Sequence, residues 1–167
     1  LLAALDSGNI DLVIAGMTPT EERKKSTDFS SIYYRAEQTV LIRAADAATY
    51  TTVESLKKAM IGAQKGAIQV GIAKKQIKGM ADANADSPEV KELGKVADLV
   101  LELKNRKIDG LVVETEVARA YASANPDLAV APFVFPDSEG GSAVAVKKGS
   151  QALLDAVPQP RGADVPF

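Results

Sequence analysis

The stretch IDLVIAGMTPTEERKKSTDFSSIYY, residues 10–34, decides the fold. Ile10 and residues 12–15 form a short, nearly continuous apolar run, which is typical of a strand buried on both faces. A turn rich in Gly, Thr and Pro follows, and then a basic segment led by Arg23. Open α/β sheets bind ligands at the carboxyl ends of their strands. The stretch therefore predicts an α/β fold with a ligand site directly after residue 15.

Thr18 and Arg23 are the chemical groups that this turn would present. Arginine carries a planar fork that grips a carboxylate with two parallel hydrogen bonds. The simpler interpretation of Arg23 is a solvated charge within the run 21–25, and that of Gly16 and Thr18 is an ordinary turn before a helix. The position of Arg23 just beyond Gly16 and Thr18 instead favours a carboxylate site, suited to the α-carboxylate of an amino acid.

The composition excludes several classes of protein. The 167 residues suffice for one ordinary domain or two small lobes, and the 46% hydrophobic content is that of a globular chain. A formal net charge of −2 and only 5% aromatic residues argue against a nucleic-acid partner. The chain has neither Cys nor His, which removes thiol and imidazole catalysis and the usual zinc sites. We expect no cofactor and no metal.

The remaining sequence predicts alternating strands and helices. Residues 1–8 read as the end of a helix that stops at Gly8. Right-handed βαβ units and a mostly parallel sheet follow from the alternation between residues 38 and 135. The expected strands are 38–43, 61–64, 111–113, 128–135 (broken by Pro132) and 143–146, and the expected helices are 53–59, 66–77, 88–103 and 116–124.

Four blocks of sequence resemble one known family. Residues 16–34 match G-M-T-x-T-x-x-R followed by D-F-S-x-x-Y-Y, a signature of the family 3 solute-binding proteins, the extracytoplasmic amino-acid receptors of ABC importers. Residues 61–69 look like the V-G-V-Q-x-G-T segment of that family, and residues 108–114 are similar to its V-D-A-V-I-x-D/E segment. Residues 141–149 resemble its returning strand, G-x-A-x-A-V-K-K-G.

The resemblance implies a two-lobed, type II periplasmic-binding-protein-like fold of the α/β class. It places a partial first lobe at 1–37, a complete second lobe at 38–138 and a hinge return into lobe 1 at 139–157. The first lobe would then be truncated, because the chain starts after elements that the family has. The tail at 158–167 departs from the family. We expect a gene fragment whose tail comes from a shifted reading frame, with a natural truncated paralogue as the alternative.

The resemblance also implies roles for single residues. Arg23 matches the residue that takes the ligand α-carboxylate, and Thr18 matches one whose hydroxyl and N–H serve both ends of the amino acid. Gly16 matches a residue whose carbonyl accepts from the α-ammonium. Glu114 matches the anionic partner of that ammonium, often Asp in relatives. Glu116 competes with Glu114 locally, but we expect it to face outward in the first turn of a helix.

Ala67 and Ile68 depart from the family pattern. The family usually has Thr where this chain has Ala67, so a hydroxyl donor is lost and the backbone N–H groups after Gly66 would hold the carboxylate. Gln69 would contact polar side chains of the ligand. Other polar residues are expected to be structural: Tyr33 and Tyr34 as hinge or core residues, Lys74–Lys75 and Lys147–Lys148 as solvated faces, and Asp109–Gly110 as a turn.

The implied function is that of the substrate-binding component of an amino-acid ABC transporter, not an enzyme. It would bind an L-amino acid in a cleft between the lobes and dock on the membrane subunits of the importer. The implied location is the periplasm or the extracellular space, or the cell surface through a lipid anchor outside this sequence. Two alternatives stay open: a prephenate or arogenate dehydratase of the same fold, and the ligand-sensing domain of a membrane receptor.

Overall fold

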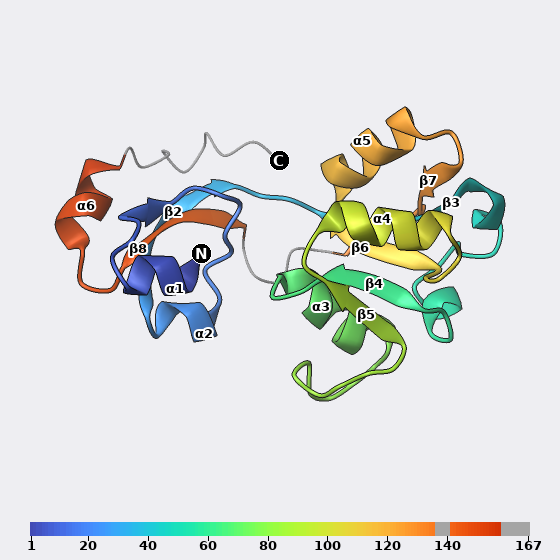
Figure 1. Cartoon of the computed structure of the whole chain (residues 1–167), viewed down its shortest axis with the longest axis horizontal. Coiled ribbons are helices and arrows are strands. Elements are labelled where there is room, and N and C mark those ends of the chain that lie inside the picture. The colour runs from blue at the N-terminus through green and yellow to red at the C-terminus, as the bar shows by residue number, and fades with distance from the viewer. Residues whose placement is uncertain (136–140, 158–167) are drawn as a thin grey trace. The chain divides into compact units, whose positions relative to one another are not determined.

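The computed structural model describes residues 1–135 and 141–157, which form two compact units. Unit 1 combines Leu1–Ala36 with Asp137–Phe167, and unit 2 is the continuous segment Glu37–Pro136 (Figure 1). The expected tail at 158–167 lies outside the described residues, as do the first two residues of the expected hinge return. Each unit has its own sheet and its own buried cluster of apolar side chains.

Unit 1 is built on a three-stranded antiparallel sheet. Its order is β1-β8-β2, so that β8, from the end of the chain, lies between two strands from the beginning. Helix α1 ends before Gly8, whose φ of 73° suits a helix stop, as the sequence predicts. The elements are α1 Leu2–Asp6, β1 Leu12–Val13, α2 Glu21–Lys24, β2 Thr27–Tyr34, β8 Ser142–Lys147 and α6 Gln151–Ala156.

The prediction that residues 10–15 form a strand buried on both faces is wrong. Only Leu12 and Val13 are in β1, and Val13 alone is buried, whereas Leu12 is 36% and Ile14 62% exposed. Among the described residues β1 pairs only with β8, and the small core of Leu5, Val13, Met17 and Ala145 covers one face. An apolar run cannot distinguish a central strand from an edge strand with one covered face.

Unit 2 contains a five-stranded sheet of order β5-β4-β6-β3-β7. Strand β4 is parallel to β5 and β6, and β3 is antiparallel to both β6 and β7. Four strands therefore share one direction and β3 alone opposes them, so two neighbouring pairs are parallel and two are antiparallel: the sheet is mixed, whereas the sequence predicts a mostly parallel one. The bounds are β3 Gln38–Arg43, β4 Ile61–Gln64, β5 Val90–Leu93, β6 Gly110–Glu114 and β7 Leu128–Val130.

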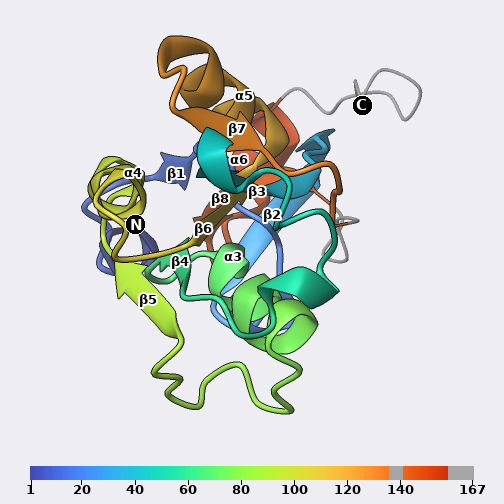
Figure 2. The same ribbon diagram turned by 90° about the vertical axis from the view of Figure 1, so that its right-hand side faces the viewer.

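Helices cover both faces of this sheet (Figure 2). Successive residues of one strand pack in different cores: Val40 and Ile42 belong to the cluster that contains the helical segment 68–77, and Leu41 belongs to the cluster under α4 and α5. Burial on both faces explains why β3 reads as a continuous apolar run. The helices are α3 Ile68–Gly71, a π-helix Ile72–Ile77, α4 Val96–Lys104 and α5 Thr115–Ala124, with 3₁₀ turns at Ala44–Asp46 and Glu54–Leu56.

Two predicted helices differ from the structure. The expected helix at 88–103 is strand β5 followed by α4, because Gly94 separates two apolar segments whose spacing happens to continue in the helical period. The expected helix at 53–59 is a single 3₁₀ turn, in which Thr52 Oγ1 accepts a hydrogen bond from the N–H of Ser55 at 3.3 Å. Glu54 pairs there with Lys57, not with Lys58 as helical spacing suggests.

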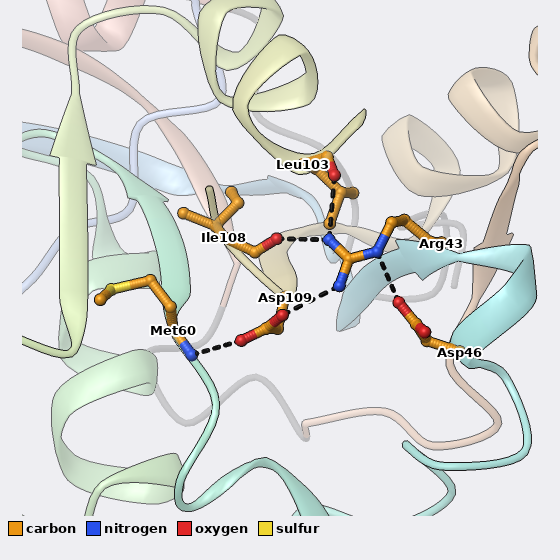
Figure 3. A network of polar contacts seen from close by, with 6 residues as sticks. All are labelled: Arg43, Asp46, Met60, Leu103, Ile108 and Asp109. Atoms are coloured by element: carbon orange, nitrogen blue, oxygen red, sulfur yellow. Dashed lines mark hydrogen bonds and ion pairs between the residues drawn. The ribbon is translucent and has the colours of Figure 1, made fainter. Parts of the chain in front are cut away.

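A buried guanidinium joins several elements at the amino-terminal end of β4 and β6 (Figure 3). Arg43 donates Nε to Asp46 at 2.5 Å, Nη2 to Asp109 at 2.9 Å, and Nη1 to the carbonyls of Leu103 and Ile108 at 2.9 and 2.5 Å. The other oxygen of Asp109 accepts from the N–H of Met60 at 2.9 Å. The turn at Asp109 thus carries a structural ion pair, which the Asp-Gly pattern of a turn does not predict.

Electrostatics keep this guanidinium charged. Burial alone would lower the pKa of Arg43, but the hydrogen bonds to Asp109 and Asp46 outweigh burial and raise the pKa above its ordinary value.

The expectation of a solvated Lys74 is wrong: Lys74 is 4% exposed and pairs with Glu92 at 2.9 Å. Both cations lie in positions where an apolar stem is buried and the charge finds a partner.

Candidate functional site

The turn after β1 brings the predicted unit 1 residues together. Gly16 has a φ of 64°, in the left-handed region that favours glycine, and its N–H donates to Tyr33 Oη at 3.0 Å. Met17 is buried, and its carbonyl accepts from the N–H of Ala143 in β8 at 2.9 Å. Thr18 follows at 6% exposure. The turn is therefore anchored on both sides to the sheet of unit 1.

Arg23 lies over this turn. It belongs to α2, whose N-cap Thr20 accepts the N–H of Arg23 on its Oγ1 at 3.2 Å. The guanidinium Nη1 donates to the carbonyl oxygen of Thr18 at 3.0 Å. A short capped helix thus folds the Arg23 side chain back onto the backbone of the predicted site. Thr18 and Arg23 are in direct contact, with Gly16 two residues before Thr18 in the same turn.

Tyr33 contributes a contact with the turn that the sequence alone does not predict. Tyr33 lies in β2, a strand that the sequence does not predict, and its hydroxyl oxygen accepts a hydrogen bond from the N–H of Gly16. The signal in the sequence is the tyrosine pair at the end of 27–34, but which of the two faces the turn depends on the register of β2 against β8, where the pairing shifts twice. That register cannot be read from the residues alone.

In unit 2, the other predicted residues gather at one edge of the sheet. Strands β4 and β6 are parallel, so the segment after β4 and the last residue of β6 meet at their carboxyl ends. Ala67 is the N-cap of α3, makes no side-chain capping bond, and is followed by Ile68 in the first turn. Glu114 ends β6, is half-buried, and immediately precedes α5. The structure therefore brings Ala67, Ile68 and Glu114 to one edge of unit 2.

Two glutamines join this edge. Gln38 is the first residue of β3 and pairs directly with Glu114 across the antiparallel ladder. The Nε2 of Gln69, in the first turn of α3, donates to the Oε1 of Gln38 at 2.8 Å. The sequence predicts a contact of Gln69 with polar ligand groups, but it predicts Gln38 only as part of a strand. A polar residue at 2% exposure is the feature that marks Gln38 as unusual.

The competing carboxylate behaves as expected. Glu116 lies in the first turn of α5, is largely exposed, and pairs with Arg119 at 2.6 Å.

Within the described residues, no group of three or more acidic side chains is arranged to hold a metal ion. The helices seen in 1–135 and 141–157 are all too short or too polar to cross a bilayer.

Comparisons with known proteins agree on one family. The model of bacterial extracellular solute-binding proteins, family 3, matches residues 1–159. The chain is 36% identical to the arginine-binding extracellular protein ArtP of Bacillus subtilis over 90% of its own length, and 33% identical to a probable histidine-binding protein of Campylobacter jejuni over 90%. These relatives are binding proteins rather than enzymes, and nothing in the matches favours the dehydratase alternative.

Solved structures give the same result. The chain is similar, with a TM-score of 0.81 and 37% identity over 93% of its length, to an amino acid ABC transporter substrate-binding protein of Streptococcus pneumoniae bound to L-arginine. It spans 62% of that protein, and 56% and 55% of the Bacillus and Campylobacter relatives. On the family match and these similarities, the chain belongs to the family 3 bacterial extracellular solute-binding proteins.

Proposed function

We propose that this protein binds an L-α-amino acid and serves as the substrate-binding component of an ABC importer. The contact between Arg23 and the Thr18 carbonyl carries the proposal, because it holds a guanidinium over an anchored turn in a family of solute-binding proteins. Relatives are named for binding arginine, histidine and glutamine, which supports an amino acid as the class of ligand.

The proposed contacts divide between the two ends of the amino acid. Arg23 would bind the α-carboxylate through its planar fork, together with the Thr18 hydroxyl and the backbone N–H groups of Ala67 and Ile68. The Gly16 carbonyl and the Glu114 carboxylate would accept from the α-ammonium. Because Ala67 has no hydroxyl, we expect a weaker carboxylate site than one with Thr at this position, by about 1.5–3 kcal/mol for a hydrogen bond to a charged group.

The partners and location complete the proposal. The membrane subunits of an ABC importer would receive the loaded protein in the periplasm or at the outer surface of the cell. Attachment there through a lipid anchor outside this sequence is the finer form of the proposal. Labelling with radioactive palmitate in cells that express the longest reading frame containing the sequence tests it, and an unlabelled protein in the soluble fraction would contradict the anchor.

The decisive experiment replaces Arg23. In the longest reading frame containing this sequence, Arg23→Ala should weaken amino-acid binding at least about tenfold, because an unpaired carboxylate in a binding site costs 2–5 kcal/mol or more. Calorimetry with the twenty amino acids provides the measurement. Arg119→Ala, which removes an exposed guanidinium paired with Glu116, is the matched control and should bind as the wild type does.

A second variant separates binding from folding. Glu114→Gln should lower affinity by a similar factor while leaving the melting temperature nearly unchanged, because the pairing of β6 uses backbone groups. Glu116→Gln serves as its control. Equal affinity of Arg23→Ala and the wild type would refute the carboxylate assignment, and a much lower melting temperature for Glu114→Gln would make Glu114 a structural residue.

A further inference from the structure

Gln38 is held rigidly between two neighbouring segments. Its N–H donates to the carbonyl of Phe135 at 3.3 Å, and its carbonyl accepts from the N–H of Phe135 at 2.7 Å. On its other side it pairs with Glu114 in the ladder of β3 and β6. With 2% of its surface exposed, the Gln38 side chain has little freedom to change its rotamer. A rigid amide can impose an orientation on whatever it contacts.

The side chain of Gln38 is hydrogen-bonded to the side-chain amide of Gln69. A primary amide has two N–H donors at one end and an acceptor oxygen at the other. Since Gln69 Nε2 donates to Gln38 Oε1 at 2.8 Å, the donor end of Gln69 is turned toward Gln38. The oxygen end of Gln69 consequently faces away from Gln38. Gln69 lies in the first turn of α3, one residue after Ile68, at the edge of the sheet described above.

The ladder position of Glu114 favours the orientation in which the Gln38 oxygen points to Gln69. Residues directly opposite in an antiparallel ladder project to the same face, so Gln38 and Glu114 are side-chain neighbours. The negative charge of Glu114 attracts the NH₂ end of a nearby amide and repels its oxygen end. Helix α3 also contacts β6. In this corner of unit 2, Gln38 is thus next to Glu114 in the ladder and bonded to the side-chain amide of Gln69.

We propose that Gln38 is a positioning residue that fixes Gln69 with its amide oxygen toward the ligand. The site then selects amino acids whose side chains end in N–H donors, above all a cationic guanidinium. This inference rests on the proposed function and deepens it, since it names the class of side chain. An amide free to turn by 180° would accept donors and acceptors alike, so the selectivity depends on Gln38 and not on Gln69 alone.

L-Arginine and L-citrulline form the test pair, because citrulline has nearly the shape of arginine but carries a carbonyl oxygen in place of one nitrogen. Calorimetry on the longest reading frame containing the sequence should show that the wild type prefers arginine. Gln38→Met, which keeps the length of the side chain and removes its oxygen, should reduce that preference about tenfold. Gln76→Met makes the same change at an exposed position and should have no effect.

A double-mutant cycle shows whether Gln38 acts through Gln69. In a Gln69→Met background, Gln38→Met should no longer change the arginine-to-citrulline ratio. The side-chain amide protons of Gln69 should also exchange faster in Gln38→Met than in the wild type, by nuclear magnetic resonance. This last readout requires no ligand, so it reports on the amide contact even in a variant that binds poorly.

The outcomes separate the two proposals. A wild type that binds no amino acid refutes the proposed function and the inference with it. A wild type that binds amino acids while Gln38→Met keeps the full preference for arginine refutes the inference alone. Preference of the wild type for citrulline would show that the amide of Gln69 is oriented the other way, and would overturn the inference as well.

Discussion

At the scale of single residues, Arg43 shows how one buried cation can stabilise a junction. Its guanidinium serves two carboxylates and two carbonyl oxygens, so every removed bond leaves a partner unsatisfied. We expect Arg43→Ala to lower the free energy of unfolding of unit 2 by about 3 kcal/mol. Denaturant titration monitored by circular dichroism measures it. Arg119→Ala, at an exposed pair, should cost less than about 0.5 kcal/mol; equal losses in both variants would contradict a structural role for Arg43.

The contacts of Asp28 with Lys148 and Gly149 in unit 1 should weaken in acid. A hydrogen bond from Lys148, together with one from the N–H of Gly149, lowers the pKa of the Asp28 carboxyl below its ordinary value. A folded pKa below the unfolded one gives stability that is complete above about pH 4 and is lost as the pH falls through the folded pKa. Asp28→Asn should therefore flatten the fall in melting temperature between about pH 5 and 2.

The control for this titration is Asp11→Asn, at an exposed aspartate between α1 and β1. Its melting curve should keep the acid dependence of the wild type. Some dependence should persist in Asp28→Asn as well, because the hydrogen bond from Lys91 lowers the pKa of Glu102 in unit 2. An unchanged acid profile in Asp28→Asn would show that the contact with Lys148 and Gly149 does not contribute to stability.

The candidate site illustrates what residue types alone can predict. Gly16, Thr18 and Arg23 are close in sequence, so a turn and a short helix suffice to bring them together, and the structure does so. Whether these residues contact a ligand stays a prediction. The contact of Gln38 could not be predicted, because its partner Gln69 is distant in sequence and the contact depends on how α3 packs against β4 and β6. Tyr33 was missed for the same kind of reason, since its contact depends on strand register.

At the scale of elements, replacing two different glycines of unit 2 by alanine should change stability in opposite directions. A Cβ at Gly62 in β4 would lie 2.5 Å from Ile108 Cδ1 and 3.1 Å from Leu99 Cδ2, whereas a Cβ at Gly71 in α3 would meet nothing within 4 Å. Gly62→Ala should therefore destabilise the protein by about 1–3 kcal/mol through overpacking. Gly71→Ala should stabilise it by about 0.5–1 kcal/mol by removing backbone freedom from a helix. Thermal denaturation of the pair decides; a stabilised Gly62→Ala would contradict the close approach of α4 to β4.

Elements whose patterns are unambiguous were predicted well. The strands at 38–43 and 61–64 agree with the structure residue for residue, because each is a short apolar run between clear breaks. The helix expected at 88–103 failed because apolar residues of β5 and α4 share a helical spacing by chance, which only pairing with β4 resolves. The lone antiparallel strand was not expected because direction within a sheet depends on distant partners.

At the scale of the whole molecule, the two units differ in whether one segment of the chain or two segments form them. Unit 2 is one continuous segment with two buried clusters, whereas the central strand of the unit 1 sheet comes from the far end of the chain. We expect residues 37–136 to fold alone with a cooperative thermal transition. Residues 1–36 alone should stay unfolded, because they lack β8. Circular dichroism and amide exchange of both segments provide the measurement, and an unfolded 37–136 segment would contradict the independence of unit 2.

The pairing of Tyr34 with Ser142 shows that unit 2 is inserted between two paired strands of unit 1. Strands β2 and β8 are antiparallel neighbours, so a two-residue turn after Tyr34 would make them an ordinary hairpin. In terms of connectivity, unit 2 is therefore a very large hairpin loop, and its own ends are held together where Gln38 meets Phe135. A loop with closed ends can be exchanged as a cassette. Replacing residues 37–136 by the corresponding segment of a relative would exchange the whole Gln38–Gln69 corner in one step and leave the sheet of unit 1 with the same strand order.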